Sequence, residues 1–587
     1  MAKLLTNKDW QLIKKFGRYF VPHKRWLIIS LSSIPLSTAA GLVFLWLVER
    51  IIDDYIVPGD ISGLKINAIL LGGVLVLNLL LDGTYSYTFS KAGGLAIVDL
   101  RNELFGKTLR FPMSYYDKNP LGVTLSRLTS DMEAISESFA TGILGLLSES
   151  IKTIALISYL FFLNWRLTLV LLLVAPLIII TMKYLRRKMR AAYNDSRSFL
   201  AKSAAYLQES LNGMKTIQLY NAEEEAWEKY NQLNKDYCDA QNRSNVYDSA
   251  MFSIVEGITS IATALVIWYG AIQIWDFGYT MGLLVVFVTT LGRLFIPVRQ
   301  FAQQISTIQR ALSALEHISH LFHQETEEPN YSNTPTEPKA MPLEEIAFEN
   351  VSFRYSPDSP DVLNNISFRM KKGDRIALVG TTGSGKSTII KLLTKSYTGY
   401  RGSIKINGRE LREIPLSTIR RTISLMQQDQ FLFSDTIGFN ISLGREGISD
   451  RDVKNAASFV YADQFIRQLP GQYDFIIQDN GDNLSKGQAQ LISFARAICG
   501  DSELIILDEA TSAVDSLTEQ LIQKAIENIF SARTVIAVAH RLSTIKHSNS
   551  ILVLENGSII EQGTHDQLIR KGGKYAHLVN SWNAQKP

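Results

Sequence analysis

The segment Gly380-Thr-Thr-Gly-Ser-Gly-Lys-Ser387 decides the fold of the second half of this chain. It matches the P-loop pattern, in which glycines let backbone N–H groups close around phosphate oxygens at a helix N-terminus. An apolar run at 376–379 precedes it, and a helix-like run at 388–393 follows it. This context predicts a nucleoside triphosphate site between a strand and a helix. We expect Lys386 to reach the outer phosphates and Ser387 to bind magnesium.

Two carboxylates follow a second apolar run, 504–507, further along the chain. Asp508 and Glu509 then lie at the carboxyl edge of a predicted sheet, where ligands of open α/β folds bind. We expect Asp508 to hold the metal, directly or through water, and Glu509 to orient or deprotonate the attacking water. By itself such a pair is most often a solvated strand end, but together with the P-loop it favours a catalytic role.

Between these motifs, Leu484-Ser-Lys-Gly-Gln488 resembles the signature Leu-Ser-Gly-Gly-Gln of the ATP-binding cassette (ABC) family. Four further residues fall in that family's order. Tyr355 resembles the aromatic that stacks on adenine, Gln428 the nucleotide-sensing glutamine, Asp515 the loop that crosses to the partner, and His540 the γ-phosphate histidine. Singly, Tyr355 and Gln428 favour ordinary structural roles. Their shared order is what makes the resemblance specific.

The resemblance implies ATP and Mg²⁺ as cofactors, and it assigns three groups of site residues. The catalytic residues are Glu509 and His540. The nucleotide contacts are Tyr355, Gly380, Thr381, Thr382, Gly383, Ser384, Gly385, Lys386, Ser387, Thr388, Gln428, Ser485, Gly487, Gln488 and Asp515. The metal contacts are Ser387, Gln428 and Asp508.

The first half of the chain has a different composition. The whole chain has 587 residues, of which 46% are hydrophobic and 20% charged, and its net charge of +4 is too small to indicate a nucleic-acid partner. Six apolar stretches are long enough to cross a bilayer. They lie at 26–48, 66–88, 141–163, 167–185, 252–275 and 281–301. The sequence therefore predicts a multi-pass membrane protein, and the resemblance points to the bacterial plasma (inner) membrane.

Lysine and arginine mark the cytoplasmic side of such spans. They crowd before the first span and after the fourth, whereas the connections after the first, third and fifth spans carry few cations. The N-terminus and the cassette should therefore be cytoplasmic. The long inner connections, 91–137 and 183–247, are predicted to be helical stalks. Each should turn back once, near 110–116 and 211–214. In the family that the chain resembles, such turns carry movement of the cassettes to the membrane helices, and the turns near Tyr115-Tyr116 and 215–218 are the candidate coupling contacts.

The predicted domains are a six-span transmembrane domain with two stalk loops at 1–322, a proline-rich linker at 323–343, and a nucleotide-binding domain at 344–587. This order resembles an exporter-type ABC half-transporter of the bacterial multidrug and lipid exporter family. That family has an all-α transmembrane domain of six long helices, the type IV exporter fold, followed by an α/β P-loop domain. The resemblance implies ATP hydrolysis that drives export or flipping of an amphiphile by alternating access.

The same resemblance implies a dimer, because each ATP lies between one subunit's P-loop and the other's signature. Lys486 stands where the family usually has glycine. It is either a neutral variant or the mark of a heterodimer with one weakened ATP site, and we favour the heterodimer slightly over a homodimer. A second function class, a regulatory or channel-like ATP-binding subunit, is disfavoured by Glu509 and His540.

Charged residues within or near the spans are the remaining hint about substrate. Asp82, Glu256 and Arg293 are costly in hydrocarbon and face either a cavity or a partner. Two interpretations are open: Asp82 and Glu256 bind a cationic amphiphile, or such groups form ion pairs between helices. The sequence does not identify the substrate.

Overall fold

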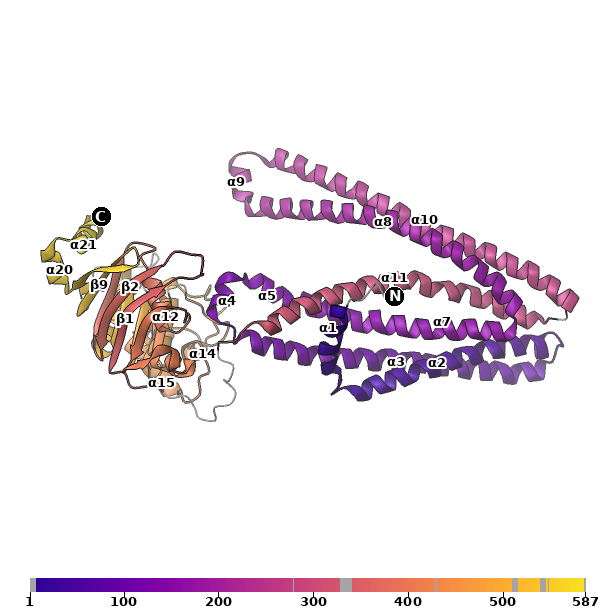
Figure 1. Cartoon of the computed structure of the whole chain (residues 1–587), viewed down its shortest axis with the longest axis horizontal. Helices are drawn as coiled ribbons and strands as arrows, with labels where there is room; N and C mark the ends of the chain where they lie inside the picture. Colours follow the sequence, from indigo (N-terminus) through magenta and orange to yellow (C-terminus); the bar gives the residue numbers. More distant parts are fainter. Residues whose placement is uncertain are drawn as a thin grey trace. The chain divides into compact units, whose positions relative to one another are not determined.

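The computed structural model describes residues 7–277, 279–327, 340–427, 430–508, 516–538, 545–546 and 548–584. The chain forms two compact units. The first comprises Met1–Leu109 and Leu121–Gln324, and the second comprises Arg110–Pro120 and Glu325–Pro587 (Figure 1). The short segment Arg110–Pro120 thus packs with the second unit, although the first unit surrounds it in sequence.

The first unit has helices and no strand among its described residues. Six long helices correspond to the six predicted spans: α2 (Lys24–Ile51), α3 (Ile61–Thr108), α7 (Leu144–Leu163), α8 (Trp165–Asn212), α10 (Glu223–Phe277) and α11 (Met281–His323). The shorter elements are α1 (Asn7–Gly17), α5 (Leu121–Leu128), α6 (Ser130–Glu137), α9 (Met214–Leu219), a 3-10 turn at Arg18–Phe20, and π-helical turns at Ile52–Ile56 and Ser138–Ile143. Helices α2 and α3 pack together, as do α8 and α10 (Figure 1).

The apolar side chains of this unit face outward. Among the described residues, five helical segments are long and apolar enough to cross a membrane, and the apolar part of α11, Met281–Gly292, is shorter. In the most apolar stretch of α3 only 6% of residues are buried, and Ile69 and Leu79 are 76% and 71% exposed. Soluble proteins rarely expose so large an apolar surface to water. The unit is therefore built for hydrocarbon, and this is an integral multi-pass membrane protein.

The connections after the first, third and fifth spans each end in a residue that caps the next helix. Asp60 accepts hydrogen bonds from two backbone N–H groups at the start of α3, and Asn164 does the same for α8. Thr280 accepts from the N–H of Leu283 at the start of α11. Side-chain oxygens at this position satisfy amide groups that have no partner within the helix. Local sequence therefore fixes where these three helices begin.

The stalk regions differ in how far they match the prediction. At the second turn, α8 ends at Asn212 and α9 begins at Met214, as the sequence predicts. The return of the first stalk, predicted as one helix, is instead divided into α5 and α6. Asn119, between α4 and α5, is extended because the residue before a proline avoids the α region. A second break, at Thr129, separates α5 from α6.

A polar cluster joins three of the membrane helices. Asp82 of α3 accepts hydrogen bonds through one oxygen from Lys152 of α7, at 3.1 Å, and from Ser37 of α2. The Lys152 ammonium also lies 5.2 Å from the ring centre of Tyr85. For Asp82, the structure shows the helix-to-helix ion pair.

The other two charges differ from Asp82. Glu256 is exposed on α10 and forms no ion pair with the residues that the structure describes. The side chain of Arg293 lies outside the described residues.

The second unit contains two sheets. The larger has the strand order β10-β9-β3-β8-β7-β6, in which β9 to β6 are parallel and β10 is antiparallel. Its strands are β3 (Arg375–Gly380), β6 (Ile423–Met426), β7 (Leu504–Asp508), β8 (Thr534–Val538), β9 (Ser550–Glu555) and β10 (Ser558–Gly563). The smaller antiparallel sheet has the order β2-β1-β4-β5, with β1 (Glu345–Phe353), β2 (Leu363–Lys371), β4 (Arg401–Ile406) and β5 (Arg409–Glu410).

The second unit also contains ten described helices. They are α4 (Met113–Lys118), α12 (Lys386–Leu393), α13 (Leu416–Thr422), α14 (Ile437–Ser442), α15 (Asp450–Phe459), α16 (Asp463–Ile466), α17 (Lys486–Ile498), α18 (Ser516–Ala532), α20 (His565–Lys571) and α21 (Lys574–Ala584). Two 3-10 turns lie at Leu411–Glu413 and Gln472–Asp474. This α/β arrangement follows the predicted fold class.

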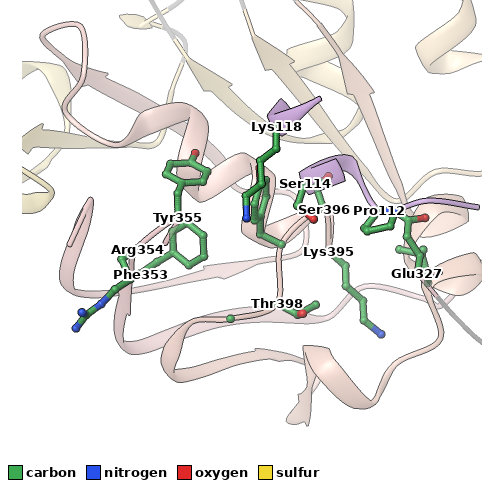
Figure 2. Close-up of a pocket in the computed structure, with 13 residues that line it drawn as sticks. Pro112, Ser114, Lys118, Glu327, Phe353, Arg354, Tyr355, Lys395, Ser396 and Thr398 are labelled. Carbon is green, nitrogen blue, oxygen red and sulfur yellow. The ribbon is translucent and has the colours of Figure 1, made fainter. Parts of the chain in front are cut away.

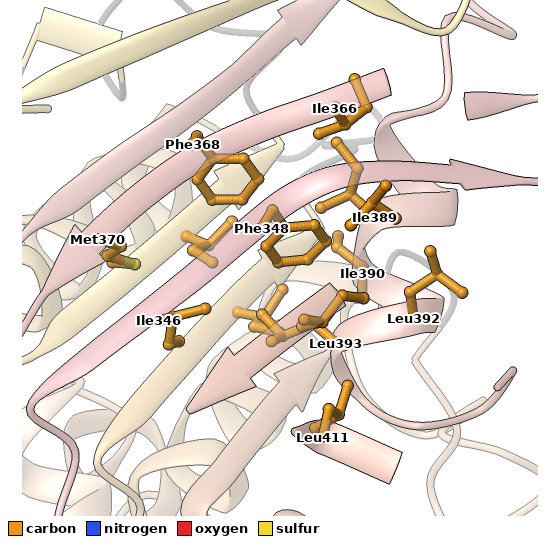
Figure 3. Close-up of a cluster of buried hydrophobic side chains, with 14 of the residues drawn as sticks. Ile346, Phe348, Ile366, Phe368, Met370, Ile389, Ile390, Leu392, Leu393 and Leu411 are labelled. Carbon is orange, nitrogen blue, oxygen red and sulfur yellow. The ribbon is translucent and has the colours of Figure 1, made fainter. Parts of the chain in front are cut away.

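A single apolar core joins the smaller sheet to α12 (Figure 3). Phe348 of β1 and Phe368 of β2 stack with ring centres 4.5 Å apart. Ile389, Leu392 and Leu393 of α12 are fully buried against this cluster. Burial of each such side chain contributes roughly 1.5–3 kcal/mol, so α12 is held firmly by its apolar face.

Substitution of Lys152 by Met should destabilise the first unit, because it leaves Asp82 without its cation. The pair is partly exposed, so we expect a loss of roughly 1–2 kcal/mol, less than for a fully buried pair. Thermal unfolding of the purified protein in detergent measures this. Arg50→Gln, which breaks the exposed pair between Arg50 of α2 and Asp54 of the following π-helical turn, is the control and should have a smaller effect. Equal effects of the two substitutions would contradict the prediction.

Candidate functional site

The register of the larger sheet places the P-loop and Asp508 at one edge. Val538 of β8 pairs with Leu378 of β3 on one side and with Asp508 of β7 on the other. All three strands are parallel, so their carboxyl ends meet at this edge. Gly380 ends β3 and leads into the P-loop there. Two motifs that are far apart in sequence are therefore neighbours across one strand.

Two glycines of the P-loop are required by the backbone. A Cβ atom on Gly380 would lie 2.3 Å from the carbonyl oxygen of Leu554 on β9, so a larger residue does not fit there. Gly383 has a φ of +83°, which L side chains rarely adopt. The loop can therefore turn tightly between β3 and α12 only with glycine at these positions.

Lys386 lies within the loop that it is expected to serve. Its ammonium donates hydrogen bonds to the carbonyl oxygens of Gly380 and Thr381, both at 2.9 Å. Burial lowers the pKa of Lys386, and the nearby carboxylate of Asp508 partly offsets that effect. An anion placed in this loop would favour the charged ammonium.

Two further observations show that the loop fits a phosphate group. The hydroxyl of Ser384 is buried and has no hydrogen-bond partner among the described residues. The N-terminus of α12 follows Gly385 and has no side-chain cap. Its first N–H groups lack partners within the helix, and the helix dipole favours negative charge at this end. The donors present are those that a nucleotide phosphate accepts from.

The candidate metal residues are only partly described. Ser387 is exposed on the first turn of α12, and Asp508 is half-buried at the end of β7. Among the residues that the structure describes, no three His, Cys, Asp or Glu side chains gather as a metal site. Magnesium commonly takes one or two carboxylates together with substrate phosphates, and this pair suits that arrangement. Gln428, Glu509, Asp515 and His540 lie outside the described residues.

The signature residues form the start of α17. The Ser485 hydroxyl accepts from the N–H of Gln488, and the Gln488 side chain accepts from the N–H of Ser485. This reciprocal pair is a capping box, so both residues have a structural role that sequence reasoning missed although the Ser-x-x-Gln spacing signals it. Gly487 is buried, whereas Lys486 is exposed as the first residue of the helix.

Tyr355, the predicted base-stacking residue, lies in an aromatic cluster next to α12. Its hydroxyl is 3.0 Å from Oγ1 of Thr388, one of the predicted nucleotide contacts. Its ring meets those of Phe353 and Tyr397 edge-on, with centres 5.0 and 5.1 Å apart. A polar cavity of about 320 Å³ adjoins this cluster, and Lys118 of α4 extends toward it (Figure 2).

A contact whose partners the sequence does not identify joins α4, at the turn predicted as a candidate coupling contact, to this cluster. Asp117 of α4 accepts hydrogen bonds from Lys391 of α12 and from Tyr397. Burial opposes ionisation of Asp117, but these two hydrogen bonds outweigh it and lower its pKa. The pKa of Tyr397 is raised, by burial first and then by the carboxylate. Nothing in the local sequence signals this contact, since its members are far apart in the chain.

Comparison with known proteins gives consistent matches along the chain. Residues 27–298 match the family described as ABC transporter transmembrane region, and residues 363–512 match the family described as ABC transporter. The chain is 34% identical to the uncharacterized ABC transporter ATP-binding protein YknV of Bacillus subtilis, over 98% of this chain and 95% of that protein.

Two further matches connect the sequence and the fold to transport. The chain is 36% identical to the ATP-dependent lipid A-core flippase of Albidiferax ferrireducens, over 82% of this chain and 83% of that protein. It resembles the solved structure of a bacterial Atm1-family ABC exporter with ATP bound, with a TM-score of 0.74 and 26% identity. That likeness covers 96% of this chain and 98% of the other.

Ser485→Ala separates the structural role of the signature serine from its expected nucleotide role. Loss of the cap should cost about 1 kcal/mol of stability. Ser449→Ala removes the equivalent cap of α15 and should cost about as much. Thermal unfolding and ATP turnover are measured for both variants, and only Ser485→Ala should lower turnover at saturating ATP. Equal turnover would restrict Ser485 to capping.

Ser384→Ala tests the fit of the P-loop to phosphate. It removes a buried hydroxyl without a partner among the described residues, so the melting temperature should stay the same or rise. ATP should bind more weakly, by roughly tenfold to a hundredfold for one lost hydrogen bond to a charged group. Ser493→Ala removes a similar buried hydroxyl from α17 and should leave ATP binding unchanged. A titration with unaltered affinity for Ser384→Ala would contradict the fit.

Proposed function

Because this chain belongs to the ABC transporter family and is an ATPase coupled to transport, we propose that it exports or flips an amphiphilic substrate across a membrane. The substrate class is a drug, a lipid or a similar molecule. One observation carries the proposal: the same chain contains a helical unit with exposed apolar faces and a second unit with a P-loop. A soluble ATPase has no use for the first unit.

Amphiphile transport is supported by the relatives and by the surface of the helical unit. The Albidiferax protein is named as a flippase for lipid A-core, which has both charged and apolar parts. In this chain, Asp82 already has a cation partner and is less suited to bind a cationic substrate. Glu256 is exposed within the apolar part of α10 and stays the candidate for a polar headgroup.

ATP hydrolysis would be carried out at the edge of the larger sheet. Bound ATP with magnesium supplies the phosphoanhydride bond that is cleaved. Lys386 would exchange its two loop carbonyls for phosphate oxygens, and the N-terminus of α12 would add N–H donors. Ser387, Gln428 and Asp508 would hold magnesium. Glu509 would take the proton of the attacking water, and His540 would contact the γ-phosphate.

A complete site would require two subunits. This chain carries one P-loop and one signature, and the family fold implies dimerisation. The signature of each subunit would face the P-loop of the other, and exposure of Ser485 and Lys486 suits such a contact. Lys486 would bring an additional cation toward the partner's phosphates. This substitution favours a second, different subunit slightly over a second copy of this chain.

ATP-driven closure would be linked to transport as a shift between two states. ATP held between two cassettes favours their closed arrangement, so it biases the helices toward the conformation compatible with that arrangement. The cationic stretch around Lys183–Arg190 supports an orientation with the cassette in the cytoplasm. A bacterial inner membrane is the proposed location.

Magnesium-dependent ATP turnover by the full chain in lipid tests this function. Turnover by this chain alone, lowered by roughly two to four orders of magnitude in Glu509→Gln as for loss of a general base, would support a homodimer. Turnover that appears only with a second subunit would support the heterodimer. Glu503→Gln, at a carboxylate just before β7 that pairs with Lys372, is the control. Absence of turnover in both settings would instead favour the regulatory alternative.

A further inference from the structure

The short helix α4 is fixed to the P-loop helix by one carboxylate. Oδ2 of Asp117 lies 3.0 Å from the Lys391 ammonium and 2.6 Å from the Tyr397 hydroxyl. Both donors are held on the second unit: Lys391 is in α12, and Tyr397 follows that helix. Asp117 belongs to the same compact unit. It therefore orders two side chains next to the P-loop at once.

Those two side chains both lie next to Tyr355, together with Phe353 and Thr388. The Lys391 ammonium lies 5.6 Å from the ring centre of Tyr355 and equally far from that of Tyr397. The two tyrosine rings are nearly perpendicular, at 86°. A cation near a ring face and an edge-on aromatic contact both favour a defined ring orientation. The position of the Tyr355 ring is thus set by the two groups that Asp117 holds together with Phe353 and Thr388.

We propose that Asp117 is a positioning residue for nucleotide binding: by holding Lys391 and Tyr397 it fixes the ring of Tyr355 on which the nucleotide base stacks. This inference rests on the proposed function, because it takes Tyr355 as the base-stacking residue. Asp117 itself does not contact the nucleotide. Asp117 contributes to the binding of the base and not to that of the phosphates, which Lys386 and the N-terminus of α12 would bind.

The physical reason is the location of Tyr355. It lies two residues beyond the end of β1, in a stretch without regular structure. A side chain there would lose conformational freedom when a base stacks on it. Ordering the ring in advance reduces that loss and strengthens binding. Because coupling free energies are reciprocal, base binding should equally stabilise the contact of α4 with α12.

The test compares a ligand with a base and one without. Displacement of the fluorescent nucleotide trinitrophenyl-ATP from the full-length protein in lipid gives dissociation constants for ATP and for inorganic tripolyphosphate. In Asp117→Asn the constant for ATP should rise by roughly threefold to tenfold, less than the full loss of a charge-assisted hydrogen bond, because Asp117 acts on the base only through Tyr355. The constant for tripolyphosphate should change by less than about twofold, the size of a weak exposed ion pair.

Two further variants separate positioning from general damage. Tyr397→Phe keeps the ring and removes the hydroxyl, so it should weaken the binding of ATP but not of tripolyphosphate. In the double variant its effect should not add to that of Asp117→Asn. Glu555→Gln breaks the Lys574–Glu555 pair, which is about as exposed as the Asp117–Lys391 pair. It should change neither constant.

The outcomes are distinct. An ATP constant unchanged by Asp117→Asn, or a rise that tripolyphosphate shares equally, would overturn the positioning role. Additive effects of Asp117→Asn and Tyr397→Phe would overturn it as well. Failure of the unsubstituted protein to bind ATP would overturn the proposed function instead. Tight ATP binding by the unsubstituted protein with no effect of Asp117→Asn would overturn this inference alone.

Discussion

The burial of one face of α12 is the constraint on which the nucleotide site depends. Ile389, Leu392 and Leu393 pack into the core beneath the smaller sheet, while the other end of the same helix carries Lys386 and Ser387. Anchoring the apolar face fixes the direction of the helix axis. Since the N–H groups and the dipole of the first turn act along that axis, packing of the core determines where a phosphate is stabilised.

The two units solve opposite solvation problems with similar side chains. The second unit buries its isoleucines and leucines between sheets and helices, whereas α3 presents them outward. In hydrocarbon a charged side chain is unfavourable in free energy unless it is paired. The structure pairs Asp82 with Lys152 and Ser37, which lie on neighbouring helices. The same two contacts hold α2, α3 and α7 together.

Several residues at the candidate site combine a structural role with a proposed chemical one. Ser485 and Gln488 form the capping box that begins α17, and the same helix start is proposed to face a partner. Tyr355 is part of an aromatic cluster and also the expected platform for a base. If these residues bind nucleotide as proposed, local stability and nucleotide binding are coupled at these positions, and variants must be compared with matched structural controls to tell the two apart.

Local features of the sequence determined the P-loop with its strand and helix, the apolar spans, and the helix break before Met214. Each depends on residues close together in the chain: glycines at a tight turn, apolar length, or a cap. The sequence indicates a contact near Tyr115-Tyr116, but tertiary structure alone decided that Asp117 meets Lys391 across 274 positions and that Asp82 pairs with Lys152. Those pairings depend on which surfaces the folded chain brings together. A sequence pattern reports the nature of a side chain, but the partner of a charged group is set by packing that involves the whole domain.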